Sequence, residues 1–316
     1  MFWRLYQVLS QSFPPPPTWS VDDMPNQSGR VHLVTGGAAG IGLETTKALL
    51  MKDATVYIAT RNRRKAEAAI ALLKEETGNE AHFLELDLAS LESVKRAATE
   101  FLAKETALHV LYNNAGVLFT DMKLMTVDGY DLQFGTNVLG HFYLTRLLMP
   151  ALIAGQARVV NVSSVMPLIL TAPTSSFDYL TDGPDRRKLS LGKYRMYGIS
   201  KLGNILHAKE LHRRYAQDGI VATAVNPGIL KTDLYKTMPS RFRRWIYDRL
   251  LYPPPFGAIT QLYAGTAPEG ASMGGQFLVP WARIGPTSVE ASDADLARRL
   301  WDWLEEQVRF HETQHS

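Results

Sequence analysis

Short apolar runs alternate with longer helical patterns along most of this 316-residue chain. This alternation is typical of parallel strands that are joined by helical crossovers. Strands are predicted at residues 31–34, 55–59, 82–86, 110–112, 158–162, 221–225 and 276–279. Helices are predicted at residues 41–50, 63–76, 91–104, 142–152, 197–215 and 293–307.

The order of these elements predicts one α/β domain with a Rossmann-type, doubly wound parallel sheet. We expect about seven strands with helices on both faces, because parallel crossovers are right-handed and cover both sides. The domain is assigned to residues 30–316, and residues 1–29 to an N-terminal arm. The prolines at 14–17 are expected to form a stiff spacer, with a ligand for a proline-binding module as the alternative. An irregular region at 235–256 is predicted to be a substrate lid.

Composition excludes several kinds of site and partner. The chain has no cysteine, which rules out disulfides, thiol nucleophiles and Cys-ligated metals, and its histidines lack metal-ligand spacing, so no metal is expected. A net charge of +3 is too small to indicate nucleic-acid binding. The N-terminal apolar run is broken by Arg4 and Gln7, which fits neither a membrane span nor a secretory signal. We therefore expect a cytoplasmic protein, with peripheral membrane contact through this run as an open alternative.

A glycine-rich turn follows the first predicted strand and opens the first helix, which is the setting of a dinucleotide site. Gly36 permits a tight turn, Gly40 lets the backbone approach a pyrophosphate, and Gly42 allows close helix packing. The helix N-terminus adds free N–H groups and a partial positive charge. Ala39 and Ile41 belong to the same predicted cofactor-binding turn.

Tyr197 and Lys201 are separated by one helical turn and therefore share a helix face. A tyrosine has a pKa of about 10 and is a poor base at neutral pH. A nearby ammonium group stabilises the phenolate, and a proton donor tuned in this way suits carbonyl reduction. The alternative interpretation is an ordinary pair of residues on a helix surface.

Taken together, these motifs resemble the short-chain dehydrogenase/reductase family, from about Gly29 to the C-terminal helix. The likeness is narrower to its retinol-dehydrogenase-like and WW-domain-oxidoreductase-like branch, including fungal members. The resemblance implies a catalytic group of Asn137, Ser164, Tyr197 and Lys201. It also implies that the following residues contact the cofactor: Asp87, Leu88, Asn114, Ala115, Gly116, Tyr197, Lys201, Pro227, Gly228, Ile229 and Thr232. Ser164 would donate to the carbonyl oxygen, and Asn137 would hold a water that links Lys201 to solvent.

The chain departs from the usual family pattern between Ser164 and Tyr197, which lie 33 residues apart. We interpret residues 167–193 as an insertion that shapes the substrate pocket or covers its edge. Its apolar start suits a lipophilic substrate, although core packing explains it equally well. Further candidates for the pocket or lid are Phe119, Met166, Leu168, Trp245, Tyr247 and Leu250.

The end of the second strand indicates which cofactor is used. An NAD site usually carries an acidic residue there for the ribose diol, whereas this chain has Thr60 followed by Arg61. A guanidinium pairs with a 2′-phosphate. This pattern favours NADP(H) over NAD, with a plain surface arginine as the alternative.

The combined prediction is an NADP(H)-dependent oxidoreductase that interconverts a lipophilic ketone or aldehyde and its alcohol, with Tyr197 as general acid and base. A non-catalytic NADP-binding regulator on the same fold is the rival hypothesis. The resemblance allows a monomer or a homodimer.

Overall fold

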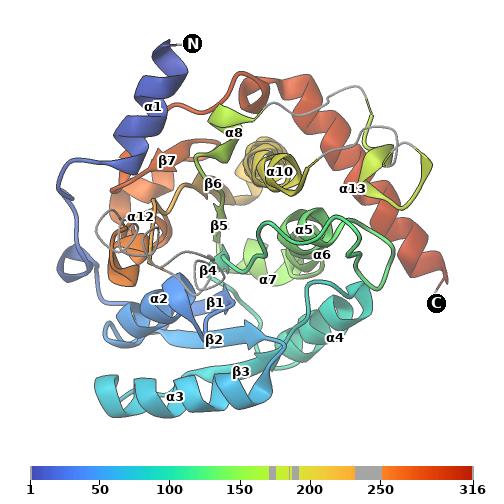
Figure 1. The fold of residues 1–316 in the computed structure, drawn as a ribbon. Coiled ribbons are helices and arrows are strands. Elements are labelled where there is room, and N and C mark those ends of the chain that lie inside the picture. Colours follow the sequence, from blue (N-terminus) through green and yellow to red (C-terminus); the bar gives the residue numbers. More distant parts are fainter. Residues whose placement is uncertain (1, 171–175, 185, 187–191, 232–250, 315–316) are drawn as a thin grey trace.

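The computed structural model describes residues 2–170, 176–184, 186, 192–231 and 251–314 (Figure 1). In this part of the chain eight strands form one sheet in the order β3-β2-β1-β4-β5-β6-β7-β8. The strands are β1 (Val31–Thr35), β2 (Thr55–Thr60), β3 (His82–Glu85), β4 (Val110–Asn113), β5 (Arg158–Val162), β6 (Val221–Val225), β7 (Phe277–Val279) and β8 (Arg283–Ile284). The Rossmann-type α/β prediction is confirmed.

Strands β1 to β7 pair in parallel, and β8 alone is antiparallel to its neighbour. The central strands are buried on both faces, which explains why they are mostly apolar and show no regular alternation of apolar and polar residues. The described sheet has one strand more than the seven predicted. The additional strand β8 is only two residues long, too short for any pattern to reveal it.

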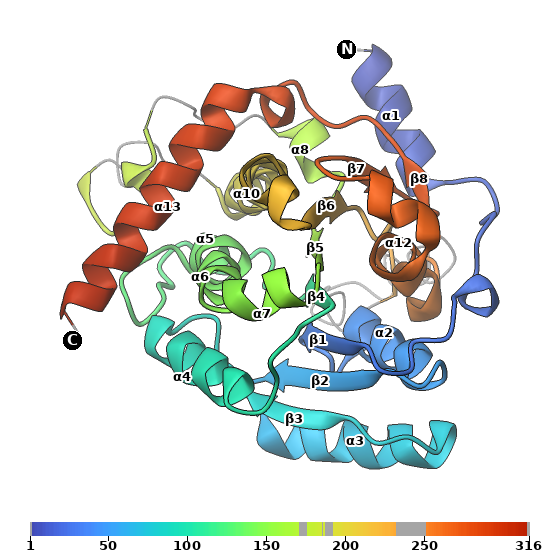
Figure 2. The same cartoon turned by 180° about the vertical axis from the view of Figure 1, so that it is seen from behind.

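Helices cover both faces of the sheet (Figures 1 and 2). One core lies between the sheet and α2, α3 and α12, and the other between the sheet and α4, α6, α10 and α13. The helices are α1 (Phe2–Ser12), α2 (Gly40–Leu50), α3 (Arg63–Thr77), α4 (Leu91–Leu102), α5 (Leu132–Phe134), α6 (Gly140–Leu147), α7 (Met149–Ala154), α8 (Met166–Ile169), α10 (Lys193–Tyr215), α12 (Pro254–Thr266) and α13 (Ala294–Gln314).

The helix predicted at 142–152 is wrong as a single element. A π-helical turn at Gly135–Leu139 leads into α6, and the chain breaks at Leu148 before α7 begins. Pro150 explains the break, because its ring clashes with the preceding turn and it has no N–H to donate. The π turn places Asn137 at an irregular point of the helix, as is frequent at functional sites.

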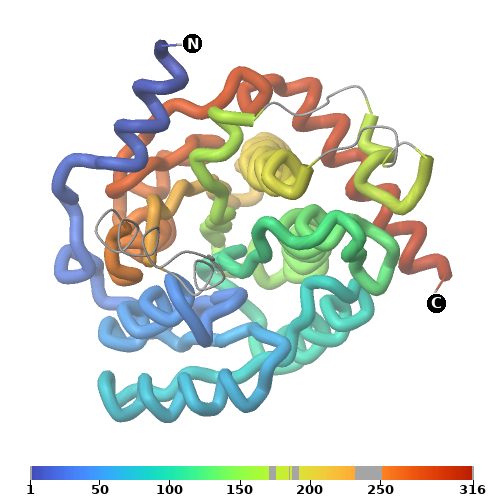
Figure 3. The backbone as a smooth tube through the Cα atoms, in the orientation of Figure 1, coloured from blue at the N-terminus to red at the C-terminus, as the bar shows by residue number. Residues whose placement is uncertain are grey.

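The first residues of the N-terminal arm form helix α1, which packs against α8 at one side of the sheet (Figure 3). The chain termini lie on opposite sides of the molecule. The predicted lid falls mostly outside the described residues, and its described end includes the first turn of α12. No helix in the described ranges is both long and apolar enough to cross a membrane.

Candidate active site

The predicted site residues gather at the carboxyl edge of the sheet, around the ends of β1 and β4. The chain order reverses between these two strands, since β1 continues outward to β2 and β4 to β5. In open α/β sheets, ligands bind outside the carboxyl ends of the strands at such a switch point.

The glycine-rich turn has the shape that a dinucleotide requires. Gly40 has a left-handed φ of +54°, and a Cβ added there would meet nothing within 4 Å, so its backbone is open to a ligand. A Cβ on Gly42 would lie 2.4 Å from the carbonyl oxygen of Gly36, so only glycine lets α2 approach the turn so closely. Ala39 is exposed beside them as the N-cap residue of α2. This cradle fits a pyrophosphate at the helix N-terminus.

Thr35, which sequence analysis did not single out, joins the turn to the loop after β4. Its Oγ1 accepts hydrogen bonds from the backbone N–H groups of Asn114 and Ala115, both at 2.9 Å. The side chain of Asn114 donates to the Thr35 carbonyl oxygen at 2.8 Å. These contacts hold the start of the glycine-rich turn against the loop after β4, so two predicted cofactor-binding segments meet at one threonine.

His141, interpreted from the sequence as a packed histidine, extends this network to the catalytic helix. Its Nδ1 lies 3.0 Å from the carbonyl oxygen of Asn137, and its Nε2 lies 2.9 Å from Oγ1 of Thr35. A carbonyl oxygen can only accept, so Nδ1 carries the proton and Nε2 accepts from the threonine hydroxyl. Burial lowers the pKa of His141 to about 4, so the ring is neutral near pH 7.

The side chain of Asn137 is completely buried and fully engaged. Its Oδ1 accepts from the Val117 N–H at 2.8 Å, and its Nδ2 donates to the Val117 carbonyl and to Oγ of Ser200. A Cβ on Gly116 would lie 3.0 Å from Oδ1 of Asn137 and 3.6 Å from Nζ of Lys201. Gly116 is exposed and lies directly over both side chains, so a larger residue there would crowd the Asn137 amide.

Tyr197 and Lys201 lie on α10 and face the same side of the site. Lys201 is 4% exposed, and its Nζ donates to the Val162 carbonyl at 2.8 Å and lies 5.6 Å from the centre of the Tyr197 ring. Burial lowers the pKa of Lys201 to about 8. The lysine is therefore mostly charged at neutral pH, with its charge held against the phenol ring.

The two serines after β5 have different environments. Ser163 is buried, and its hydroxyl donates to the Lys201 carbonyl at 2.7 Å. Ser164 is half-buried, and its Oγ accepts a 3.3 Å hydrogen bond from the Met166 N–H. This arrangement leaves the Ser164 hydroxyl proton without an acceptor in the described part of the chain, as a hydrogen-bond donor to substrate requires.

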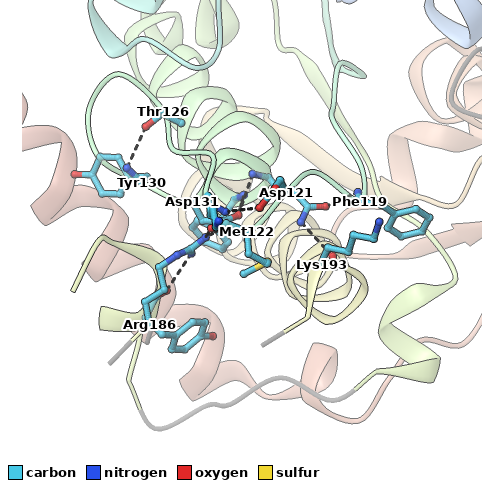
Figure 4. A network of polar contacts seen from close by, with 12 residues as sticks. Phe119, Asp121, Met122, Thr126, Tyr130, Asp131, Arg186 and Lys193 are labelled. Atoms are coloured by element: carbon cyan, nitrogen blue, oxygen red, sulfur yellow. Dashed lines mark hydrogen bonds and ion pairs between the residues drawn. The ribbon is translucent and has the colours of Figure 1, made fainter. Parts of the chain in front are cut away.

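Phe119 packs against Tyr197, with ring centres 5.2 Å apart, and against Tyr194 at 4.6 Å. Its backbone has a left-handed φ of +53°, which is uncommon outside glycine. Gln133 holds this conformation, because its Oε1 accepts from the Phe119 N–H at 2.7 Å while its Nε2 donates to the Lys193 carbonyl (Figure 4). Phe119 is thus a fixed apolar neighbour of Tyr197. Of the other pocket candidates, Met166 is half-buried and Leu168 is buried.

The predicted insertion is anchored next to these residues by a buried ion pair. Arg186 donates to Asp131 and to the Met122 carbonyl, both at 2.6 Å (Figure 4). The side chains of Arg186 and Asp131 are only 9% and 1% exposed. Asp131 also caps α5 through the N–H groups of Gln133 and Phe134, so the insertion is tied to the helix that leads to the π turn.

The remaining cofactor-side predictions lie after three other strands, β2, β3 and β6. Arg61 follows β2, and its guanidinium lies 3.8 Å from the carboxylate of Asp87, which follows β3, with Leu88 buried beside it. After β6, the loop from Asn226 reaches Gly228, which has a left-handed φ of +87°. Ile229 is half-buried beyond it. Four predicted residues lie outside the described residues: Thr232, Trp245, Tyr247 and Leu250.

Comparison with known proteins agrees with this geometry. Residues 30–173 match the family model described as short chain dehydrogenase. The chain is 48% identical to a short-chain dehydrogenase/reductase of the fungus Armillaria gallica, over 97% of this chain and 99% of that protein. It is 37% identical to another from Neocamarosporium betae, over 96% of this chain and 93% of that protein. The chain therefore belongs to the short-chain dehydrogenase/reductase family, and it is an oxidoreductase of that family.

Solved structures show the same fold. An uncharacterized protein from Mycobacterium paratuberculosis is 31% identical, with a TM-score of 0.71 over 92% of this chain and 97% of that one. The Pseudomonas aeruginosa RhlG/NADP complex is 24% identical, with a TM-score of 0.63 over 80% and 94% of the two chains. Membership of this family supports a nicotinamide cofactor.

Proposed function

We propose that this protein is an NADP(H)-dependent oxidoreductase that interconverts a lipophilic ketone or aldehyde and its alcohol. The observation that carries the proposal is the placing of the buried Lys201 ammonium against the ring of Tyr197, at the carboxyl edge of the sheet. The Lys201 ammonium lies at the end of β5 and beside Gly116 in the loop after β4, where a nicotinamide and a substrate carbonyl would meet.

Each residue has a defined part in the proposed reaction. The bound nicotinamide supplies or accepts the hydride. Tyr197 gives its phenolic proton to the carbonyl oxygen in reduction and takes it back in oxidation. Ser164 donates a hydrogen bond to the same oxygen, where negative charge develops. Lys201 stabilises the phenolate and would also bind the ribose hydroxyls. Asn137 donates a hydrogen bond to Ser200 on α10, and the water that it would hold stays part of this proposal.

The proposed preference for NADP(H) depends on Arg61. Its side chain is 70% exposed at the end of β2, and its ion pair with Asp87 is long. By contrast, Arg63 contacts Glu85 and stacks over Phe83, so it is already engaged. Arg61 is therefore the cation best placed to bind a 2′-phosphate.

A lipophilic substrate is favoured by the apolar surroundings of Tyr197. The ring of Phe119 lies against it, and Met166, two residues after Ser164, begins the apolar helix α8. We propose that the insertion and the predicted lid complete the pocket, and that the chain is organised as the arm 1–29 and the domain 30–316. The narrower kinship with the retinol-dehydrogenase-like branch belongs to the same proposal.

The proposed location is cytoplasmic, and helix α1 raises the question of peripheral membrane contact there. Its outer face exposes Phe2, Trp3, Leu5, Tyr6 and Leu9. Such a face suits peripheral contact with a membrane surface. Co-sedimentation with phosphatidylcholine vesicles, compared with a Trp3→Glu variant, would test that contact.

The test of the main proposal is turnover of a panel of lipophilic ketones and aldehydes, followed by NADPH absorbance. Tyr197→Phe should reduce turnover by a factor of about 10² to 10⁴ while the protein still binds NADPH. Tyr194→Phe, the same change one turn earlier on α10, should retain turnover. If the wild type binds NADPH but no substrate is turned over, or if Tyr197→Phe is fully active, the catalytic proposal fails and the regulator hypothesis gains support.

A further inference from the structure

Helix α1 makes an unusual contact with the rest of the protein. It packs against α8, which follows Ser164 directly (Figure 1). Its large apolar side chains point mainly outward, and its buried residues are Gln11 and Ser12. Buried polar side chains are normally hydrogen-bonded, so the partners of these two residues help to fix the position of α1.

Gln11 makes such hydrogen bonds and is only 1% exposed. Its Oε1 accepts from Nδ2 of Asn226 at 3.0 Å, and its Nε2 donates to the Pro286 carbonyl at 3.1 Å. Asn226 is also buried, and its Oδ1 accepts from the Gly228 N–H at 3.1 Å. The Oδ1 atom of Asn226 therefore stabilises the turn at Gly228, while its Nδ2 group is held by Gln11.

This turn has little freedom of its own. Gly228 has a φ of +87°, and an added Cβ would lie 3.0 Å from the ring of Trp281. The backbone N–H of Asn226 donates to the Leu278 carbonyl at 2.8 Å, which fixes the start of the turn to β7. Without Gln11, a buried amide donor of Asn226 would lose its partner, and such a group turns to find another. Rotation of that amide would also remove the acceptor of the Gly228 N–H.

We propose that Gln11 is a positioning residue that holds the Asn226–Gly228 turn in the conformation needed at the nicotinamide end of the cofactor site. The N-terminal helix, which precedes the part of the chain matched by the family model, is then a working part of that site. This inference rests on the proposed function, because that function places the nicotinamide at this turn.

The experiment compares binding of a whole dinucleotide with binding of its adenosine half. NADP⁺ contacts both ends of the site, whereas adenosine 2′,5′-bisphosphate contacts only the end at Arg61 and the glycine-rich turn. Gln11→Met keeps the side-chain volume and removes both hydrogen bonds. It should raise the Kd for NADP⁺ about tenfold and leave the Kd for the bisphosphate unchanged. Gln7→Met, the same change one turn earlier on the half-buried side of α1, should change neither.

A milder variant keeps the test decisive if Gln11→Met does not fold. Gln11→Asn retains the amide but shortens the side chain, so it cannot reach Asn226 and Pro286 together. It should weaken NADP⁺ binding in the same selective way, by a smaller factor. Equal weakening of both ligands, or no weakening of either, would overturn the positioning role. Failure of the wild type to bind any nicotinamide dinucleotide would instead refute the proposed function itself.

Discussion

Replacing Lys201 with methionine should make the nucleotide-free protein more stable at neutral pH while abolishing its activity. Burial lowers the pKa of this lysine from 10.5 to about 8, so keeping it charged in the folded state has a cost. Each pKa unit corresponds to about 1.4 kcal/mol, which gives a cost of about 3 kcal/mol at pH 7. The variant loses the hydrogen bond to the Val162 carbonyl, worth about 1 kcal/mol. That carbonyl keeps a donor in Nδ2 of Asn204 at 2.9 Å.

The net gain is therefore about 2 kcal/mol at pH 7, or a Tm about 3 °C higher for a chain of this length. The pH dependence has a definite sign. Between pH 8 and 10.5 the unfolded lysine holds its proton while the folded one releases it, so this group makes the wild type more stable as pH rises. The advantage of Lys201→Met should shrink to under about 0.5 kcal/mol near pH 9.5.

Urea unfolding at several pH values, without nucleotide, measures this difference. Lys193→Met, the same change at an exposed position of α10, is the matched control and should change the free energy of unfolding at pH 7 by less than about 0.5 kcal/mol. The reasoning is refuted if Lys201→Met is less stable than the wild type at pH 7, or if its advantage does not fall as the pH rises. Burial of the charged ammonium would then not destabilise the folded state.

Three further predictions concern the cofactor, the insertion and the substrate. Arg61→Ala should raise the Kd for NADP⁺ by about 10- to 100-fold and leave the Kd for NAD⁺ nearly unchanged, as measured by titration calorimetry. Arg64→Ala is the control. Equal losses of affinity for both cofactors would contradict a contact between Arg61 and the 2′-phosphate. Asp131→Asn leaves the Arg186 guanidinium buried without its counter-charge and should lower the free energy of unfolding in urea by about 3–5 kcal/mol. A loss under about 1 kcal/mol would mean that the pair behaves like an exposed one. Phe119→Ala should lower kcat/KM for a bulky ketone about tenfold more than for a small one in steady-state assays, because the lost ring contacts only the larger substrate. Equal losses would indicate a structural role.

Most of the fold could be predicted because its signals are local. Strands β5 and β6 begin and end at the predicted residues, since each is a short, mostly apolar run that is largely buried. Helix α10 begins earlier than predicted, at Lys193, and α13 continues to Gln314, because helix ends depend on packing that a pattern does not contain.

Of the helices that escaped prediction, the two longest, α1 and α12, did so for different reasons. The prolines before α12 indicate a loop, yet Pro254 and Pro255 occupy the first turn of the helix, where no N–H is needed. Helix α1 exposes most of its apolar side chains, so it does not follow the usual rule of one apolar face against the core.

For the site, the motifs predicted which strand ends matter but not the contacts between them. The bond between Gln11 and Asn226 joins residues 215 positions apart, and no local pattern encodes it. The role of Thr35 likewise depends on the loop after β4, which only the folded sheet brings beside it.

The hydrogen bonds of Thr35 have a mechanical consequence. Since one hydroxyl group serves the loop after β4 and, through the neutral imidazole of His141, the backbone at Asn137, those segments can shift only as one block. Any adjustment that admits or releases ligands must then come from parts of the chain outside that block. The part of the candidate site that Thr35 and His141 hold together therefore stays rigid while the rest of the site adjusts to a ligand.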